Sequence, residues 1–124
     1  MLCIEYPTII VGERTLVVRY SIAAQVIMKR RGCDPKLLKE LLDPANPAAR
    51  DNLLVVFSAM VAENFLDAKP EAFSFDGAPT PEYWMAQIEP QQIFEVDRVI
   101  AESMGKVSEA LKATAPPPRL KVAS

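Results

Sequence analysis

A two-residue turn between two β-rich runs, followed at once by a helix start, most constrains what this chain can fold into. Residues 3–11 and 14–20 are rich in β-branched and aromatic residues, which favour strands. Gly12-Glu13 lies between them, and glycine at the first central position suits a type II′ turn. Ser21 follows, and serine is a favourable N-cap residue. The sequence therefore predicts an N-terminal β-hairpin that leads into a helix without a linker.

The predicted turn fixes the register of the hairpin within residues 3–20 and sorts its side chains into two faces. Val11 is expected opposite Arg14, and Ile9 opposite Leu16. The more apolar face then holds Pro7, Ile9, Val11, Leu16, Val18 and Tyr20. Because a lone hairpin is only marginally stable in water, we expect helices or another subunit to cover this face.

Start and stop signals divide the rest of the chain into four or five helices. The first is predicted over residues 22–31, and Gly32 follows its end. Further starts combine a capping side chain with a proline, at Asp34-Pro35, Asn46-Pro47 and Thr80-Pro81. The middle helix is predicted over residues 47–66 and the last over residues 90–112, with one long loop at residues 67–79.

These elements predict an α+β fold that is mainly α, with the hairpin followed by four to five helices. The single domain is expected to span residues 3–112. Residues 113–124 hold three consecutive prolines and few apolar residues, which predicts a disordered C-terminal tail. The middle helix is apolar on nearly all sides, so we expect it to be the core helix with Leu54, Phe57 and Val61 buried.

Side-chain chemistry does not favour an enzyme. The 124 residues include no histidine, which is the commonest general base and metal ligand, and only four glycines. Cys3 and Cys33 are interpreted as reduced, small hydrophobic residues. Four carboxylates of the last helix lack a convergent partner and are interpreted as a solvated face, namely Glu95, Asp97, Glu102 and Glu109. We therefore expect no catalytic activity, no cofactor and no metal.

The net charge of −2 is unevenly distributed. Residues 1–40 carry +3, residues 41–113 carry −7 and residues 114–124 carry +2. Because no basic stripe is interleaved with aromatic residues, we expect no nucleic-acid partner. The longest apolar run, residues 53–62, is shorter than the roughly 20 residues that a bilayer requires, and we expect neither a targeting segment nor a membrane partner. The acidic middle is either a solvated surface or a means of selecting partners.

The last predicted helix carries an apolar seam that allows two interpretations. Its members follow one another at steps of three or four residues, in the order Ile93, Val96, Ile100, Met104, Val107 and Leu111. Packing within the chain explains such a seam, and so does a groove or zipper for a partner helix. Trp84 is open to the same two interpretations, since tryptophan is common in cores and at binding hot spots. The candidate partner-binding residues are Trp84, Ile93, Val96, Ile100 and Met104.

The order of elements resembles the small tail assembly chaperones of long-tailed, siphovirus-type bacteriophages and prophages. The hairpin and first helix, "TIIVGERTLVVRYSIAAQ", and the closing helix, "IFEVDRVIAESMGKV", carry the resemblance together with the Thr-Pro-Glu start at Thr80. The likeness covers about residues 8–110 and consists of a loose pattern of turns, caps and apolar positions. The helix after Asp34 and the break from Pro44 to Pro47 are longer than the family pattern.

The resemblance implies a non-enzymatic role in the cytoplasm of the bacterial host. Proteins of this family are described as binding the tape measure protein and the tail tube protein during tail assembly, and as absent from the finished particle. The exposed edges of the hairpin and the apolar seam add an expectation of weak homo-oligomers. The alternative is a small helical structural or adaptor subunit that is retained in the tail. A toxin–antitoxin or regulatory partner is a third interpretation, which the lack of a basic surface disfavours.

Overall fold

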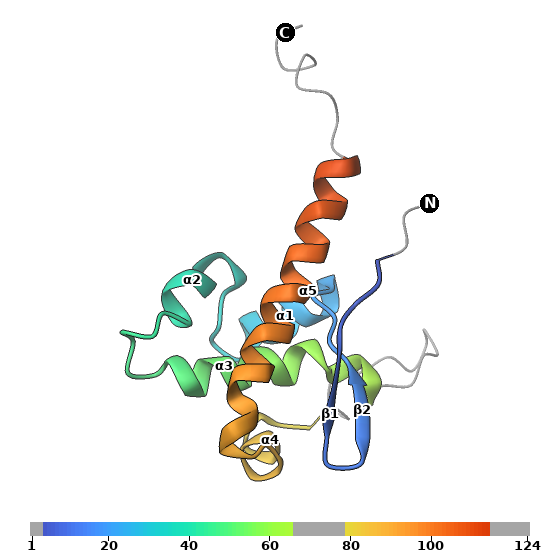
Figure 1. The fold of residues 1–124 in the computed structure, drawn as a ribbon. Coiled ribbons are helices and arrows are strands. Elements are labelled where there is room, and N and C mark those ends of the chain that lie inside the picture. The colour runs from blue at the N-terminus through green and yellow to red at the C-terminus, as the bar shows by residue number, and fades with distance from the viewer. Residues whose placement is uncertain (1–3, 66–78, 115–124) are drawn as a thin grey trace, which may run out of the picture.

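The computed structural model describes residues 4–65 and 79–114 (Figure 1). It is mainly helical, and its N-terminal hairpin is followed by five α-helices in the described residues, as the sequence predicts. The hairpin consists of β1 (Thr8–Val11) and β2 (Arg14–Val17). The helices are α1 (Ile22–Arg30), α2 (Leu38–Leu41), α3 (Ala49–Met60), α4 (Pro81–Gln87) and α5 (Ile93–Thr114).

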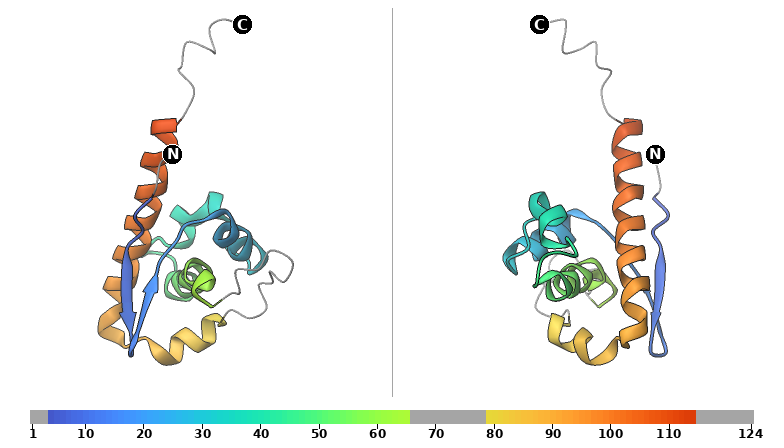
Figure 2. Two further views of the ribbon diagram at one scale, coloured as in Figure 1. Left: turned by 90° about the vertical axis from the view of Figure 1, so that its right-hand side faces the viewer. Right: turned by 60° about the vertical axis from the view of Figure 1, so that its left-hand side comes forward.

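The hairpin and α5 lie on one side of a shared core. Helix α5 runs alongside β1, while α1, α2 and α3 lie together on the other side and α4 closes one end (Figure 2). Helix α3 packs against α1, α4 and α5. The C-terminal turns of α5 extend beyond the rest of the body, so the two ends of this helix have different surroundings (Figure 1).

The hairpin has the predicted turn and register. Ile9 pairs with Leu16 and Val11 with Arg14 in an antiparallel ladder. Gly12 has a φ of +64°, and no residue other than glycine has a positive φ in the described part of the chain, which matches a type II′ turn. The predicted apolar face points inward, since its members Ile9, Val11, Leu16 and Val18 are buried.

The strands are shorter than residues 3–11 and 14–20, and beyond Val18 the chain finds a partner outside the hairpin. The backbone N–H of Val18 still donates to the carbonyl of Pro7 at 2.9 Å. The N–H of Arg19 instead donates to the carbonyl of Met60 at the end of α3, at 2.9 Å. The hydrogen bond to Met60 leads the chain away from the hairpin ladder and toward the helices.

Helix α1 begins and ends where its capping residues predict. The Ser21 hydroxyl accepts a hydrogen bond from the N–H of Ala24 at 3.1 Å, which satisfies one of the free donors of the first turn. Gly32 follows the helix with a φ of +90°, a conformation that favours glycine. The same logic applies at Thr80, whose hydroxyl caps α4.

Two predicted helices are shorter than expected. The segment after Asp34 forms a 3₁₀ turn, Pro35–Leu37, and then only one turn of α-helix in α2. The middle helix was expected over residues 47–66, but α3 spans Ala49–Met60. At its start, the Asn46 side chain accepts from the N–H of Ala48 at 2.9 Å and holds a turn. At its end, the chain tightens into a 3₁₀ turn at Ala62–Asn64.

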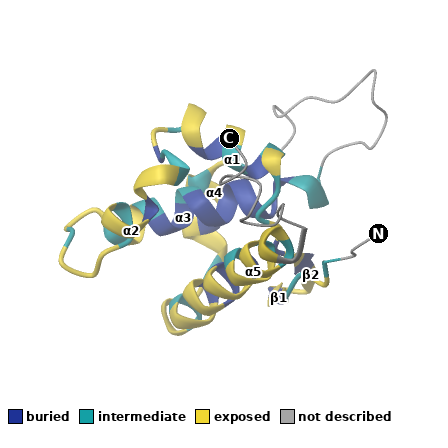
Figure 3. Ribbon diagram, turned by 90° about the horizontal axis from the view of Figure 1, so that it is seen from above, coloured by how far each residue is buried: buried dark blue, intermediate teal, exposed yellow. Residues whose placement is uncertain are grey.

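The hydrophobic core takes buried side chains from both strands and all five described helices. Helix α3 is the core helix as predicted, with Leu54 6% exposed and both Phe57 and Val61 fully buried. Figure 3 shows that α5 turns its buried side toward α3 and the hairpin and its exposed side away from them.

The last helix extends two residues into the predicted tail. A 3₁₀ turn at Pro90–Gln92 separates α4 from α5, as Pro90 predicts, and α5 ends at Thr114 rather than at residue 112. The α region is unfavourable for a residue that precedes proline. Because Ala115 precedes Pro116, Thr114 is the last residue that this rule leaves free to be helical. The rest of the predicted tail, residues 115–124, and residues 66–78, which include nearly all of the predicted loop, lie outside the described residues.

Candidate functional site

The five predicted partner-binding residues divide into a buried group and a partly exposed group. Trp84, Val96 and Ile100 are at most 2% exposed, and they fill the core of their own chain. Ile93 and Met104 are partly buried and pack against that core. The intramolecular interpretation therefore accounts for three of the five, while Ile93 and Met104 keep surface that a partner can touch. Partner binding by these residues stays a prediction.

Trp84 is the centre of an aromatic cluster between α3 and α4. Its ring meets Phe57 edge-on with 5.3 Å between centroids, and it meets Tyr83 edge-on at 4.9 Å. Phe65 lies 5.8 Å away at a tilted angle. The indole Nε1 is buried without a hydrogen-bond partner in the described part of the chain. Because edge-on aromatic contacts add to the burial of apolar area, this cluster fixes α4 on the core helix.

The apolar seam of α5 changes its role along the helix. In the first half, Val96 and Ile100 are buried against the body. The hydroxyl of Ser103 is also buried and accepts a hydrogen bond from the N–H of Tyr20 at 3.0 Å, which ties α5 to the segment after the hairpin. Farther along, Val107 is only half-buried and Leu111 is 64% exposed. The seam is thus core at the start of α5 and surface at its end.

Two adjoining hollows surround Ile93 at the start of α5. One has a volume of about 220 Å³, and the other of about 170 Å³. Ile93 and Arg50 line both hollows, so the two lie side by side. The remaining lining residues are Asp51, Leu54, Met85, Ile88, Glu89 and Pro90 in the first, and Leu42, Ala49, Leu53, Phe94 and Asp97 in the second. We call these two hollows with their lining residues the Ile93 surface.

The most exposed apolar side chain of the Ile93 surface is one that the sequence analysis missed. Phe94 is 81% exposed, and Met85 on α4 is 45% exposed. A large aromatic side chain left in water beside a hollow is a common mark of a binding site. Phe94 follows Ile93 but does not belong to the seam. An apolar residue at such a position is unusual, because the side of an amphipathic helix that faces solvent is usually polar, and this was the signal in the sequence.

The charged residues of the Ile93 surface are mostly acidic. Asp51, Glu89 and Asp97 line it with Arg50, which leaves a net charge of −2 over the two hollows. These side chains lie at the surface, so they act mainly by attracting or repelling an approaching partner rather than by strong pairing. The arrangement suits a partner segment that combines apolar side chains with basic ones.

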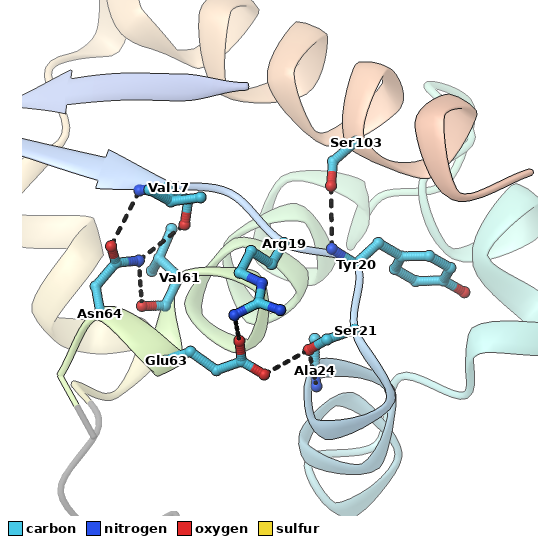
Figure 4. Close-up of polar contacts among 9 residues, drawn as sticks. All are labelled: Val17, Arg19, Tyr20, Ser21, Ala24, Val61, Glu63, Asn64 and Ser103. Carbon is cyan, nitrogen blue, oxygen red and sulfur yellow. Dashed lines mark hydrogen bonds and ion pairs between the residues drawn. The ribbon is translucent and has the colours of Figure 1, made fainter. Parts of the chain in front are cut away.

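A polar network at the joint between hairpin and α1 is structural in character (Figure 4). Glu63 accepts from the Ser21 hydroxyl at 2.7 Å and forms an ion pair with Arg19 at 2.7 Å. The side chain of Asn64 pairs with the backbone of Val17. Each group has its partner in the chain itself, so the network secures the direct passage from strand to helix that Ser21 predicts.

Burial affects two ionisable side chains. It raises the pKa of Tyr20 and of the Cys33 thiol above their usual ranges, because the charged forms lose hydration. Cys33 is 2% exposed and lies with its sulfur 3.8 Å from Oδ1 of Asn52. A buried thiol with a raised pKa is a poor nucleophile, which agrees with its interpretation as a small hydrophobic residue.

A second polar contact links α1, α3 and the segment before α4. The Arg31 guanidinium donates to the hydroxyl of Ser58, a fully buried residue of the core helix. That hydroxyl in turn donates to the carbonyl of Pro79 at 3.3 Å. Arg31 therefore has a structural partner within the chain.

Metal-binding clusters and membrane-spanning helices are both absent from the described residues. Within residues 4–65 and 79–114, no group of three or more His, Cys, Asp or Glu side chains could hold a metal ion. No helix in those two ranges combines the length and the apolar character needed to cross a membrane.

Comparison of the chain with protein-family models, curated proteins and solved structures found no match. The case for a function therefore comes from the residues of this chain and the surface that they form. Among the features described, the Ile93 surface is the one that combines exposed apolar side chains, hollows and charge of one predominant sign.

Proposed function

We propose that the chain is a non-enzymatic tail assembly chaperone of a long-tailed bacteriophage or prophage. In this proposal it acts in the cytoplasm of the bacterial host and binds an apolar helical stretch of the tape measure protein. It also binds the tail tube protein, and it leaves before the tail is complete. The order of hairpin, capped helix, core helix and closing helix supports the proposal through its resemblance to that family.

The observation that carries the proposal is the exposure of Phe94 beside the hollows around Ile93. Phe94 is 81% exposed, although burial of a phenylalanine side chain is worth about 1.5–3 kcal/mol. A small protein that keeps such a side chain in water next to a hollow has a ready anchor for an apolar partner. An amphipathic helix is the fitting occupant, because apolar side chains one turn apart can enter two adjoining hollows.

The buried candidates support this surface from behind. Val96 and Ile100 hold the first half of α5 on the core helix, and Trp84 holds α4 there. The two helices together position Met85, Ile93 and the hollow between them. We therefore place direct contact at Ile93 and Phe94, and assign a positioning role to the three buried residues.

The test is coexpression of the tape measure protein with the wild-type chain or a surface variant. Phe94→Asp adds a charge at the proposed contact, and Ile22→Asp on α1 is the matched control because Ile22 is 82% exposed. Both variants should fold, which circular dichroism of each purified variant checks. The wild type and Ile22→Asp should keep the tape measure protein in the soluble fraction, whereas Phe94→Asp should lose most of that effect.

Two results would count against the proposal. If the wild-type chain gives no more soluble tape measure protein than an empty vector, the chaperone function is wrong. If a folded Phe94→Asp variant works as well as the wild type, the function can stand but the Ile93 surface is not its binding site. The alternative of a small structural or adaptor subunit predicts instead that the chain is found in purified tails by mass spectrometry.

A further inference from the structure

We propose that residues 116–124 of one copy of this chain bind the Ile93 surface of a second copy. The proposal concerns the chain with itself and does not depend on the proposed function. It rests on the charge and apolar character of the two segments, and on a distance that keeps Leu120 of the same molecule short of the surface.

The two segments are complementary in charge and in apolar character. Residues 116–124 carry Arg119 and Lys121, a charge of +2, and the lining of the Ile93 surface carries −2. Leu120 and Val122 alternate with these basic residues. In an extended strand such alternation puts the two apolar side chains on one side and the two basic ones on the other. Leu120 and Val122 can then occupy the hollows while the basic residues face the acidic rim.

The consecutive prolines favour this binding mode. Residues 116–118 are all proline, and proline fixes φ, so a chain that contains several of them is restricted before it binds. A restricted segment loses less conformational entropy when it docks than a flexible one does. Proline-rich segments also pack well on exposed aromatic side chains, and Phe94 is 81% exposed at this surface.

The length of α5 prevents a molecule from placing its own Leu120 on its own surface. Asp97 is the last residue of α5 that lines the surface, and it lies about 26 Å along the helix axis from Thr114 at a rise of 1.5 Å per residue. Leu120 comes six residues after Thr114, and a fully extended chain spans at most about 3.6 Å per residue, or about 22 Å. Leu120 of the same molecule therefore falls short of Asp97, and we take a second copy as the occupant.

A contact of this kind joins two different patches and so is heterologous. Each copy carries one Ile93 surface near the start of α5 and one C-terminal segment beyond its end. Copies joined in this way form open chains or a ring, according to the rotation between neighbours. The contact is small, so we expect it to be weak and to depend on salt concentration.

The experiment uses two full-length variants, each lacking one half of the contact. Leu120→Asp disrupts the C-terminal segment, and Phe94→Asp disrupts the Ile93 surface. Sedimentation velocity over a range of concentrations should show that the wild type and the control Ile22→Asp associate, while each of the other two variants alone stays monomeric. A mixture of Leu120→Asp and Phe94→Asp should form one-to-one complexes that grow no further, because only one productive contact is left.

A labelled peptide of residues 115–124 provides the direct measurement. It should bind full-length Leu120→Asp in a fluorescence anisotropy titration and bind Phe94→Asp at least about tenfold more weakly, since the loss of one apolar anchor is worth about 1.4 kcal/mol. Circular dichroism confirms that both variants are folded. Equal binding of the peptide to both, or association of the wild type that neither substitution weakens, would overturn the proposal. Protection of residues 115–124 from proteolysis in dilute, monomeric wild type would show docking within one molecule and would overturn it too.

Discussion

The side-chain amide of Asn64 pairs with the backbone of Val17 as a neighbouring β-strand would. Its Oδ1 accepts from the Val17 N–H at 3.0 Å, and its Nδ2 donates to the Val17 carbonyl at 2.8 Å. The two groups of Val17 that point away from β1 are thereby satisfied (Figure 4). With Arg19 bound to Met60, this contact covers much of the free edge of β2, which would otherwise be open to pairing with another chain.

The substitution Asn64→Asp should destabilise the protein and open this edge. The new carboxylate would keep an acceptor for the Val17 N–H, but it would lose the donor to the carbonyls of Val17 and Val61 and bring a charge close to both oxygens. We expect the free energy of unfolding to fall by about 1–3 kcal/mol in urea titrations. Light scattering on warming should rise earlier, because an uncovered strand edge promotes aggregation.

Asn46→Asp is the matched control for that substitution. Asn46 also uses Oδ1 to accept a backbone N–H, that of Ala48, and Nδ2 to donate to a carbonyl, that of Glu40. Nδ2 of Asn46 reaches one exposed carbonyl, whereas that of Asn64 also reaches the part-buried carbonyl of Val61, so the cost for Asn46→Asp should stay below about 1 kcal/mol. Equal losses in the two variants would mean that the β2 edge has no special need of Asn64.

The α5 seam is core at its start and surface at its end. Replacing a seam residue by alanine should therefore lower the free energy of unfolding by different amounts at the two ends. Ile100→Ala removes a side chain that is 1% exposed and should lower the free energy of unfolding by about 2–4 kcal/mol. Leu111→Ala removes one that is 64% exposed and should change it by less than about 0.5 kcal/mol. Urea titrations of both variants check this, and a large loss for Leu111→Ala would show that the end of α5 is covered in solution.

Ser21→Ala should weaken the joint between the hairpin and α1. The hydroxyl accepts from the N–H of Ala24 and donates to Glu63, so both interactions disappear together. We expect a loss of about 1–2 kcal/mol in the free energy of unfolding. Ser108→Ala, at an exposed position within α5, should be neutral or slightly stabilising because alanine is the better helix former. If both variants match the wild type, the cap is dispensable.

The raised pKa of Tyr20 predicts a loss of stability at high pH. Burial raises the pKa of its phenol above the usual 10.0, so the unfolded chain releases this proton at a lower pH than the folded chain does. Its contribution is therefore fully present below about pH 10 and declines as the pH rises beyond that value. Urea titrations from about pH 8 to about pH 11 should show the wild type losing stability relative to Tyr20→Phe. A difference between the two proteins that does not change with pH would contradict the prediction.

Local signals in the sequence account for most element starts and for the hairpin register. Such signals act through backbone geometry or through a hydrogen bond within a few residues. Examples are Gly12 in the hairpin turn, Ser21 as the cap of α1 and Pro90 between α4 and α5. The strand ends were wrong because Arg19 and Asn64 form hydrogen bonds across the fold. Such partners lie about forty or more residues apart in the chain, and no local pattern reveals them.

The candidate site was less predictable than the fold. The spacing of the seam located the side of α5 that meets its neighbours, and Ile93 does line the hollows found there. Periodicity alone does not tell which part of a seam faces the core and which faces solvent, since that depends on how far the body reaches along α5. Phe94 falls off the seam, so only the structure reveals that it lies in water beside Ile93.

The final prediction concerns residues 115–124 and distinguishes folding from association. A chain that ends at Thr114 keeps α5 and every core residue of the part that the structure describes, so its melting temperature in dilute solution should lie within about 2 °C of the full-length value. In concentrated solution the full-length chain should melt higher than the truncated one, because association stabilises the folded state by mass action. Differential scanning fluorimetry at two concentrations about a hundredfold apart makes the comparison. A clear drop in the dilute sample would mean that the tail packs on its own body.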